Sequence, residues 1–383
     1  MKKVLVFTTA FTPHASGAEL AIEHIARRLA GNFEFFVVTM RFSQAHPRFE
    51  EKGNIKIFRI GNASRFYKLF IFPWAAFFHG KRITAAHKID VIWGVMVTYA
   101  TIGGYFLKLR YPDVPLLLTL QEGDPETYLT RGRLGLLGFW WKRLVKKADY
   151  IQAISNYLAD LASKQGARCP VVVIPNGVEE NFFEQKELSK DLEKYRTFLN
   201  LKPEDFVLIS ASRLVKKNGL DVIIAALQDL PPTVKLIIAG EGELGLNLRR
   251  MTKSLGLEDR VRFLGNIDHL ELVNYLRLSS VFVRPSRSEG LGSAFLEAMA
   301  SGLPVIATQV GGIPEFLEHE KNGLFVSLDD PHDLAEKIKR LASDRDLLSR
   351  LSTGAFRTAA GYRWSGVAES FNKLFNELTD AKS

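Results

Sequence analysis

The amino-acid sequence predicts an α/β protein that contains two doubly wound domains. Short apolar runs rich in β-branched residues alternate with amphipathic stretches along nearly the whole chain, a pattern typical of parallel strands joined by crossover helices. The chain has 383 residues, 46% of them hydrophobic, which is enough for two domains that each bury a core. This composition excludes a disordered chain. The single cysteine, Cys169, excludes a disulfide scaffold and indicates a reducing compartment.

The expected strands fall into two series, separated by a polar, charged stretch of helical character. The first series lies at 3–9, 34–39, 55–60, 90–95, 115–120, 150–154 and 171–174, and the second at 206–211, 234–239, 260–264, 280–284, 304–308 and 323–326. After residue 331 the pattern is wholly helical. We therefore expect a first domain at 1–182, a second at 183–360, and a C-terminal helix at 361–383 as a candidate to pack back on the first domain.

Two doubly wound sheets that face each other leave a cleft beyond the carboxyl ends of their strands, where such folds bind ligands. Functional residues are therefore expected in the loops that follow strands. The most informative loop lies in the segment RPSRSEGLGSAFLEAMASGLPVIATQVGG, 284–312. Gly290 and Gly292 open an expected helix that runs to about Ala300. The N–H groups at such a helix start, unobstructed at the glycines, predict a phosphate site.

Two glutamates flank this expected helix start. Glu289 stands at its lip and Glu297 follows eight residues later, a separation of about 12 Å if both lie on a helix. Carboxylates accept paired hydrogen bonds from hydroxyl groups, so the pair could bind a sugar at one end and a ribose at the other. An exposed acid and a helix-surface glutamate would explain the two glutamates alone, but not the glycines and prolines that fall in frame with them.

The E-x7-E spacing, set between a P-S loop and LEAMAxGxPVIA, resembles the donor-site signature of the retaining GT-B glycosyltransferases of family four, also described as glycosyl transferases group 1. The resemblance implies a GT-B fold, with two Rossmann-like domains facing across a cleft and the acceptor bound by the first. It implies transfer of a sugar from a nucleotide diphosphate sugar to an acceptor hydroxyl. It assigns a catalytic role to Glu289 and donor binding to Gly290, Leu291, Gly292 and Glu297.

A second segment, SRLVKKNGLD at 212–221, follows an expected strand and resembles the family's S-R-L-x-x-x-K-G-x-D element. Arg213 and Lys217 are expected to neutralise a diphosphate leaving group and are assigned catalytic roles. The sequence departs from the family here, because the family's lysine position holds Asn218. We therefore assign neutralisation of the diphosphate to Lys217, with Lys216 as the alternative. A solvated basic helix start would explain this segment if it stood alone.

The segment AGEGELG, 239–245, follows a strand and contains G-x-G-x-x-G, which is also the dinucleotide fingerprint. An NAD site is disfavoured, because the strand that ends at Leu264 continues into Gly265 and Asn266 instead of a ribose-binding acid. The segment is more similar to the family's A-G-x-G loop, which lines the nucleotide pocket. Gly240 and Gly242 are therefore assigned to donor binding.

Two loops of the first domain also resemble the family. Gly17, in Gly17-Ala18-Glu19 after the first strand, is similar to part of a G-G-x-E turn that approaches the donor phosphates. After the strand that ends near Leu120, where the family often has a histidine, this chain has Gln121 and Glu122. These two residues become candidates for sugar or acceptor contact, and a loop acid without a site role is the alternative.

No D-x-D motif and no cluster of His, Cys and Asp with metal-ligand spacing occurs in the sequence. Arg213, Lys217 and the helix start at Gly290 can supply the positive charge that a divalent ion would otherwise provide. We expect no metal and no cofactor beyond the substrate, a UDP- or GDP-linked sugar.

The net charge of +9 is concentrated in two stretches of the first domain. Residues 55–89 contain seven Lys or Arg and no acid, and residues 131–147 contain six and no acid. Aromatic residues accompany the cations, seven of them within 65–82 and Trp140 and Trp141 in the second stretch. Such surfaces suit an anionic bilayer, although part of the apolar content must be core. The N-terminus imitates a signal peptide, but no segment reaches the ~18 apolar residues that span a bilayer.

The sequence therefore predicts a metal-independent, retaining, hexosyltransferase-like glycosyltransferase, cytoplasmic and peripheral on the inner face of the cytoplasmic membrane. Its acceptor is expected to be a lipid-linked glycan of cell-envelope polysaccharide synthesis. Three alternatives stay open: a GT-B sugar-nucleotide epimerase or phosphorylase, a catalytically silent lipid-binding GT-B protein, and a nucleic-acid-binding protein. No RRM, KH or helix-turn-helix signature supports the last, so no nucleic acid is expected as a partner.

Overall fold

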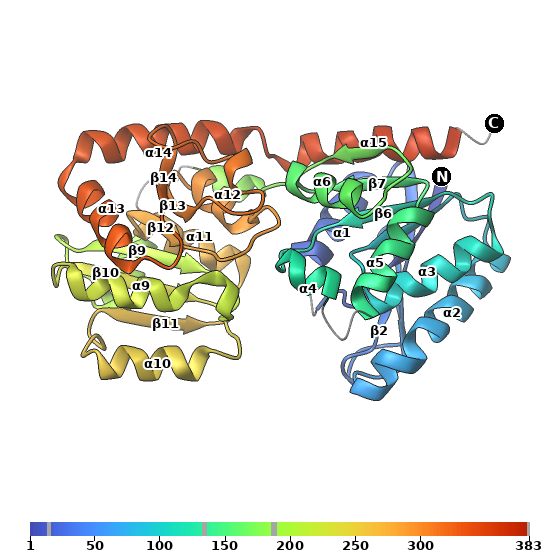
Figure 1. Cartoon of the computed structure of the whole chain (residues 1–383), viewed down its shortest axis with the longest axis horizontal. Coiled ribbons are helices and arrows are strands. Elements are labelled where there is room, and N and C mark those ends of the chain that lie inside the picture. Colours follow the sequence, from blue (N-terminus) through green and yellow to red (C-terminus); the bar gives the residue numbers. More distant parts are fainter. Residues whose placement is uncertain (14–16, 132–135, 185–189, 381–383) are drawn as a thin grey trace. The chain divides into compact units, whose positions relative to one another are not determined.

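The computed structural model describes residues 1–13, 17–131, 136–184 and 190–380 of the chain (Figure 1). The chain divides into two compact units. Unit 1 comprises Met1–Gly177 and Trp364–Ser383, and unit 2 comprises Val178–Arg363. Each unit contains one sheet with helices packed against it, as expected for two α/β domains.

The sheet of unit 1 has the strand order β3-β4-β2-β1-β5-β6-β7-β8 among the described residues. Its strands are β1 (Lys2–Phe7), β2 (Phe33–Met40), β3 (Phe49–Lys52), β4 (Ile55–Ile60), β5 (Val91–Val95), β6 (Leu116–Leu120), β7 (Tyr150–Ala153) and β8 (Val171–Val173). Its helices are α1 (Gly17–Arg28), a π-helical turn (Tyr67–Ile71), α2 (Phe72–Ala86), α3 (Tyr99–Arg110), α4 (Glu126–Arg131), α5 (Leu136–Lys147), α6 (Asn156–Lys164) and α15 (Trp364–Asp380).

The two faces of this sheet bury different helices. Along β1, Val4 and Val6 contribute to a core with α1 and α15, whereas Leu5 and Phe7 contribute to a core with α2 and α3. This alternation follows from the two-residue period of a strand, and it explains why β1 is apolar without interruption. The strands pair in parallel except for the short edge strand β3, which runs antiparallel to β4.

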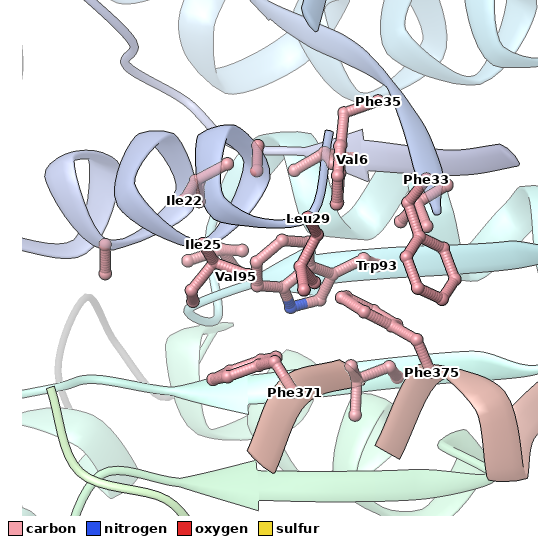
Figure 2. Close-up of a cluster of buried hydrophobic side chains, with 14 of the residues drawn as sticks. Val6, Ile22, Ile25, Leu29, Phe33, Phe35, Trp93, Val95, Phe371 and Phe375 are labelled. Carbon is pink, nitrogen blue, oxygen red and sulfur yellow. The ribbon is translucent and has the colours of Figure 1, made fainter. Parts of the chain in front are cut away.

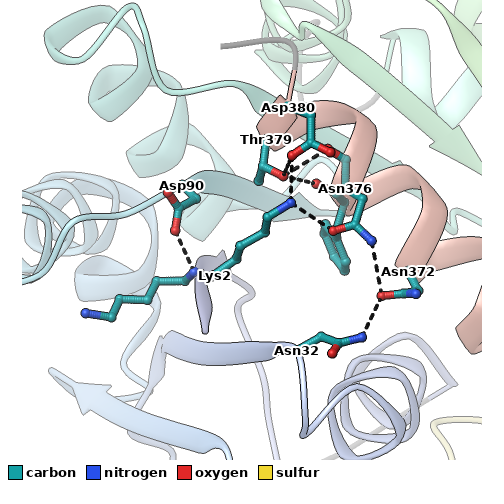
Figure 3. A network of polar contacts seen from close by, with 9 residues as sticks. Lys2, Asn32, Asp90, Asn372, Asn376, Thr379 and Asp380 are labelled. Carbon is teal, nitrogen blue, oxygen red and sulfur yellow. Dashed lines mark hydrogen bonds and ion pairs between the residues drawn. The ribbon is translucent and has the colours of Figure 1, made fainter. Parts of the chain in front are cut away.

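The C-terminal helix α15 is part of unit 1, although it follows unit 2 in the sequence. Its Phe371 and Phe375 pack against Trp93 of β5, with ring centroids 5.6 and 5.4 Å from the Trp93 ring (Figure 2). Further along the helix, Lys2 Nζ donates a hydrogen bond to Asn376 Oδ1 and forms an ion pair with Asp380 (Figure 3). The first strand and the last helix of the described residues therefore pack in one unit.

The sheet of unit 2 has the strand order β11-β10-β9-β12-β13-β14, all parallel. Its strands are β9 (Phe206–Ala211), β10 (Val234–Ala239), β11 (Val261–Gly265), β12 (Val281–Arg284), β13 (Val305–Thr308) and β14 (Gly323–Val326). Its α-helices are α7 (Glu180–Phe183), α8 (Lys190–Leu199), α9 (Leu220–Ala226), α10 (Gly245–Ser254), α11 (His269–Leu278), α12 (Ser293–Ala300), α13 (Pro331–Ser343) and α14 (Arg345–Ala360).

Each expected strand has a counterpart within one or two residues at its ends, and the segment after 331 is helical. The strand β3 was not expected, because its sequence FEEK is short and charged and its Phe49 is half exposed. An antiparallel edge strand needs only the backbone of β4 as a partner, so it carries no apolar signal.

Candidate active site

The strand order of the unit 2 sheet reverses at β9. From β9 the chain builds outward through β10 and β11 on one side, and β12 returns to the other side of β9. In open parallel sheets a ligand binds beyond the carboxyl ends of the strands at such a reversal. The loop after β9 contains Arg213 and the loop after β12 contains Glu289. The two motifs found in the sequence thus meet at the topological switch point.

Backbone packing holds these two loops together. Gly219, at the start of α9, has φ +67°, and a Cβ atom at this position would lie 2.1 Å from the carbonyl oxygen of Pro285. Only glycine allows so close an approach of the two loops in this conformation. The glycine of the second motif and the proline of the first are thus in contact.

Arg287 ties the same loops through its guanidinium. It donates to both carboxylate oxygens of Asp221, at 3.0 and 2.8 Å, and to Asp329 Oδ1 at 2.6 Å. It also donates to the carbonyl oxygen of Lys216 at 2.5 Å, and its backbone N–H donates to that of Lys217 at 2.6 Å. The bidentate pair with Asp221 raises the pKa of Arg287, so the link is permanently charged. The basic loop is therefore held at a fixed place beside the Glu289 loop.

Glu289 is held by a buried arginine. Arg284, at the end of β12, donates from Nη2 to Glu289 Oε2 at 2.7 Å and from Nη1 to the carbonyl oxygen of Ala211 at 3.2 Å. The Arg284 guanidinium also lies 4.3 Å from the centroid of the Phe295 ring. Only 14% of the Glu289 side chain is exposed. One oxygen of the Glu289 carboxylate is thus paired with Arg284, which fixes the orientation of the carboxylate.

The helix α12 begins at Ser293, and Gly292 precedes it with φ +94°. A Cβ atom on Gly292 would lie 2.6 Å from the Phe295 ring, so the turn into the helix requires glycine. The first N–H groups of the helix lack carbonyl partners within it, which is the arrangement that binds phosphate. Because Glu289 lies in the loop before this turn and not on the helix, its separation from Glu297 does not follow from the rise of a helix.

Glu297 lies on α12 with 13% of its side chain exposed. Burial raises its pKa, and the nearby charges of His269 and Arg284 partly offset this effect. His269 Nδ1 lies 4.0 Å from Glu297 Oε1. Arg284 therefore acts electrostatically on both glutamates of the motif, which makes it the ionic centre of the site.

The basic loop after β9 is closed by Asn218. The Asn218 side chain is buried and donates from Nδ2 to the carbonyl oxygen of Arg213 at 2.6 Å. Residues 216–218 form a single 3-10 turn, and the α-helix that begins within this segment, α9, starts at Leu220. At the family's lysine position this chain thus has an inward-facing amide. Arg213 and Lys216 have exposed side chains, and Lys217 is partly buried.

The AGEGELG loop adjoins the same place. A Cβ atom on Gly240, which has φ +125°, would lie 2.0 Å from the carbonyl oxygen of Ser212. The backbone N–H of Leu214 donates to the carbonyl oxygen of Glu241 at 2.9 Å, and Gly242 packs on the Leu214 backbone. The loops after β9, β10 and β12 therefore form one polar surface.

In unit 1, Gly17 is the exposed first residue of α1, and no heavy atom of the described residues lies within 4 Å of a Cβ built on it. Ser16 lies outside the described residues. Gln121 and Glu122 follow β6 and have different partners. Gln121 Oε1 accepts from Asn176 Nδ2 at 3.0 Å. Glu122 is 97% buried, since only 3% of it is exposed, and its Oε1 accepts from the Val97 N–H at 2.7 Å.

Comparison with known proteins agrees with this geometry. Residues 15–182 match the model of Glycosyltransferase Family 4, and residues 191–358 match that of Glycosyl transferases group 1. A GDP-mannose-dependent alpha-(1-6)-phosphatidylinositol monomannoside mannosyltransferase of Mycobacterium tuberculosis is 26% identical over 392 residues, covering 96% of each chain. The chain belongs to the GT-B glycosyltransferases of family four.

Two solved structures share the fold of this glycosyltransferase. Sucrose-phosphate synthase from Thermosynechococcus elongatus has a TM-score of 0.86 at 21% identity, with both chains covered completely. HepE of Anabaena, in complex with UDP and glucose, has a TM-score of 0.81 at 22% identity, covering 98% of this chain and 100% of that one. At these identities the likeness supports the fold, which is GT-B as expected.

Three site residues of the glycosyltransferase escaped sequence analysis: Arg284, Arg287 and His269. Arg284 could have been noticed as a cation in the otherwise apolar strand VFVR, because a charge at a buried position requires a partner. The partners of Arg287 lie 42 and 66 residues away in the sequence. His269 lies on α11, 28 residues before Glu297, without a local motif. Neither could be predicted without the fold.

The basic stretches of the glycosyltransferase divide between core and surface. Lys56 and Arg59 form ion pairs with Glu34 and Glu50 at 2.6 and 2.7 Å, so these two cations are not available to a partner. On α5, Trp141 is buried, whereas Lys142, Arg143 and Lys146 are exposed and Lys147 partly so. Arg131 and Arg133 lie at or beyond the limit of the residues whose side chains the structure describes.

The aromatic residues before and within α2 form an exposed stripe. Phe66, Phe70, Trp74 and Phe78 recur every four residues, and each is between 51 and 66% exposed. The Phe66 and Phe70 rings, beside and within the π-helical turn, have centroids 5.3 Å apart, and Trp74 and Phe78 lie four residues apart on one face of α2. Phe72, between them, is fully buried. Within the described residues no helix is long and apolar enough to cross a bilayer, and no group of three or more His, Cys, Asp or Glu could hold a metal ion.

Proposed function

We propose that this glycosyltransferase transfers a sugar, with retention of configuration and without a metal ion, from a nucleotide diphosphate sugar to a lipid-linked glycan. One observation carries the donor half of the proposal. Three loops that bear Arg213, Gly240 and Glu289 gather at the switch point of the unit 2 sheet, beside the start of α12. This surface offers cations, helix N–H groups and carboxylates, which are the groups that a diphosphate and hydroxyls need.

The donor would lie with its diphosphate against the start of α12, beside the backbone of Gly290, Leu291 and Gly292, which are buried. Arg213 and Lys217 would neutralise the negative charge that develops on the departing diphosphate. In this arrangement catalysis is positioning and electrostatic stabilisation. HepE of Anabaena, whose structure is a complex with UDP and glucose, supports a nucleotide-sugar donor by its likeness to this chain.

The two glutamates would bind the hydroxyl groups of the donor. Glu297, with its half-exposed neighbour His269, suits the ribose, because a buried carboxylate accepts strong hydrogen bonds from a diol. Glu289, oriented by Arg284, suits the transferred sugar. The pairing with Arg284 keeps Glu289 in place when the leaving group departs.

The acceptor half of the proposal rests on the surface of unit 1. The aromatic stripe on α2 and the exposed cations of α5 are the two components that adsorb a protein to an anionic bilayer. A lipid-linked acceptor requires such adsorption, because its glycan is presented at the bilayer surface. The mycobacterial relative, a phosphatidylinositol monomannoside mannosyltransferase, agrees with a lipid acceptor. We propose a cytoplasmic, peripheral location on this basis.

Transfer can be tested with purified protein, radiolabelled UDP- and GDP-sugars and detergent-extracted bacterial envelope lipids. The expected result is label in the lipid fraction, with the anomeric configuration of the donor kept in the product by NMR. Donor consumption without any acceptor would favour an epimerase instead. Nucleotide binding without turnover would favour a catalytically silent protein.

Membrane binding can be tested by cosedimentation with liposomes of anionic or neutral lipid. We expect binding to the anionic liposomes only, weakened by salt. Changing Lys142, Arg143, Lys146 and Lys147 to Gln should release the protein and leave nucleotide affinity unchanged. A matched control changes four exposed cations of unit 2 to Gln: Lys202, Arg249, Arg250 and Lys253. Equal recovery of the wild type with both liposomes would contradict a membrane role and favour a soluble acceptor.

A further inference from the structure

Unit 1 contains a cavity of about 380 Å³ at the switch point of its own sheet. In the strand order of this sheet the direction reverses between β1 and β5. Thr9 follows β1, Val97 follows β5 and Glu122 follows β6, and all three line the cavity. The cavity therefore occupies the place where a doubly wound sheet binds a ligand. Its volume is in the range of small-molecule sites.

The walls of the cavity are mainly aromatic and apolar. Six aromatic side chains line it, drawn from the π-helical turn, α2, α3, α4 and α5: Phe70, Trp74, Tyr99, Phe106, Tyr128 and Trp140. Trp74 and Phe106 stack with ring centroids 4.6 Å apart. Flat aromatic faces suit the apolar face of a ring or a short apolar chain.

Glu122 is a buried carboxyl in this lining, which also contains Thr9, Thr98, Lys68 and Asp124. Its Oε1 caps the Val97 N–H, but among the residues that the structure describes none donates a hydrogen bond to the buried Oε2. A buried acceptor without a donor is destabilising, because it loses its hydrogen bonds to water and gains none in the protein. Burial raises the pKa of Glu122 to about 7; the backbone N–H groups of residues 97, 122 and 121 act against this shift, and the charge of Asp124 adds to it. Capping of Val97 explains one oxygen of this carboxyl and leaves the other unexplained.

The mouth of the cavity is continuous with the exposed stripe of α2. Phe70 and Trp74 belong both to the stripe and to the cavity lining, and Leu136 of α5, which is 52% exposed, also lines it. A ligand that enters from a bilayer would thus meet apolar surface from the membrane to the cavity, and a hydrogen-bond acceptor at Glu122. This order of contacts fits an amphiphile with its hydroxylated end inward.

We propose that this cavity is the acceptor-lipid site, and that Glu122 Oε2 accepts a hydrogen bond from a hydroxyl group of the lipid headgroup while the aromatic walls contact its apolar face. The proposal rests on the lipid-linked acceptor proposed above and names its site and the chemistry recognised. It separates the two candidates of the sequence: Glu122 contacts the acceptor, whereas Gln121 positions the loop through Asn176. The hydrocarbon chain of the lipid extends out of the cavity along Phe70 and Trp74.

The probe for this site is n-octyl β-D-glucoside below its critical micelle concentration, with its per-O-methylated form as the matched ligand that cannot donate a hydrogen bond. Binding is followed at pH 8 by tryptophan fluorescence, since Trp74 and Trp140 line the cavity. We expect saturable binding of octyl glucoside by the wild type, at least about tenfold tighter than binding of the methylated form.

The decisive variant is Glu122→Gln, which can still cap Val97 but replaces the accepting Oε2 with an amide. It should weaken octyl glucoside binding about tenfold or more and leave the methylated form unchanged. The control is Glu126→Gln, an exposed acid at the start of α4 and outside the lining, which should bind both ligands as the wild type does. A second variant, Trp74→Ala at the exposed mouth, should weaken both ligands together.

Equal affinity of wild type and Glu122→Gln for octyl glucoside, or no saturable binding by the wild type, would overturn the acceptor site. If sugar transfer to lipid is intact in that case, the proposed function still holds, and the acceptor binds at another site. The expected binding pattern combined with no transfer from any nucleotide sugar would refute the proposed function and leave the amphiphile site. The two failures are therefore distinguishable.

Discussion

The switch points of the two sheets differ in how the oxygens of their carboxylates are satisfied. In unit 2, Arg284 pairs with Glu289 and Arg287 pairs with Asp221, so the charged side chains between the loops hold each other in place. In unit 1, Glu122 has one buried oxygen with no donor among the described residues. The first arrangement preorganises a polar surface for a charged ligand. The second leaves an acceptor to be satisfied by a ligand that enters an apolar cavity.

The largest effect is expected at Glu289. Glu289→Gln keeps a hydrogen-bond acceptor for Arg284 but removes the charge beside the transferred sugar. We predict that transfer falls by at least about 100-fold, while nucleotide affinity measured by calorimetry is unchanged. Glu289→Ala is a poorer test, because it would leave the buried Arg284 without its carboxylate. Glu258→Gln, on an exposed acid of the same unit, is the control, and wild-type turnover in Glu289→Gln would refute the role.

The buried carboxyl of Glu122 in unit 1 predicts that the wild type and Glu122→Gln differ in stability by an amount that depends on pH. The pKa of Glu122 is about 7 in the folded protein and 4.5 ordinarily, so the folded state binds the proton more tightly than the unfolded state. Its destabilising effect is therefore absent below pH 4.5 and complete above pH 7. Relative to Glu122→Gln, the wild type should lose about 3 kcal/mol of unfolding free energy between these limits. Parallel profiles for the two proteins in denaturant titrations would contradict the burial of a charged Glu122.

The basic loop of unit 2 gives the next test. Arg213→Ala and Lys217→Ala should each lower transfer by about tenfold or more, because each removes a charge that stabilises the departing diphosphate. EDTA should have little effect on the wild type. Lys216→Ala is the matched control on the same 3-10 turn. If Lys216→Ala is damaging and Lys217→Ala is silent, the diphosphate is neutralised one residue earlier than proposed.

The smallest effect is expected at Glu297. Glu297→Ala should weaken nucleotide binding by about 1 to 3 kcal/mol, the range for a lost charged hydrogen bond. The nucleotide diphosphate and the nucleotide sugar should lose affinity equally, since the ribose is common to both. Equal affinity of wild type and variant in calorimetry would show that the ribose is bound elsewhere.

The sequence predicted the strands and the unit 2 loops because both are local patterns. A buried parallel strand such as Val234–Ala239 is apolar on both faces, and the glycines beside Glu289 and Glu297 stand in a fixed spacing. The role of Arg287 depends on partners 42 and 66 residues away in the sequence and could not be read from spacing. The same holds for Glu122, whose unpaired oxygen is visible only once the neighbours of β6 are known.

The most direct test of the donor site is calorimetric titration of the wild type and Arg213→Ala with UDP, GDP and the corresponding monophosphates. A site built around the diphosphate at the β9 and β12 switch point predicts that one of the two diphosphates binds the wild type clearly more tightly than its monophosphate. It also predicts that Arg213→Ala loses this difference and retains the affinity for the monophosphate. Absence of binding by both diphosphates, or the same preference in Arg213→Ala as in the wild type, would contradict it.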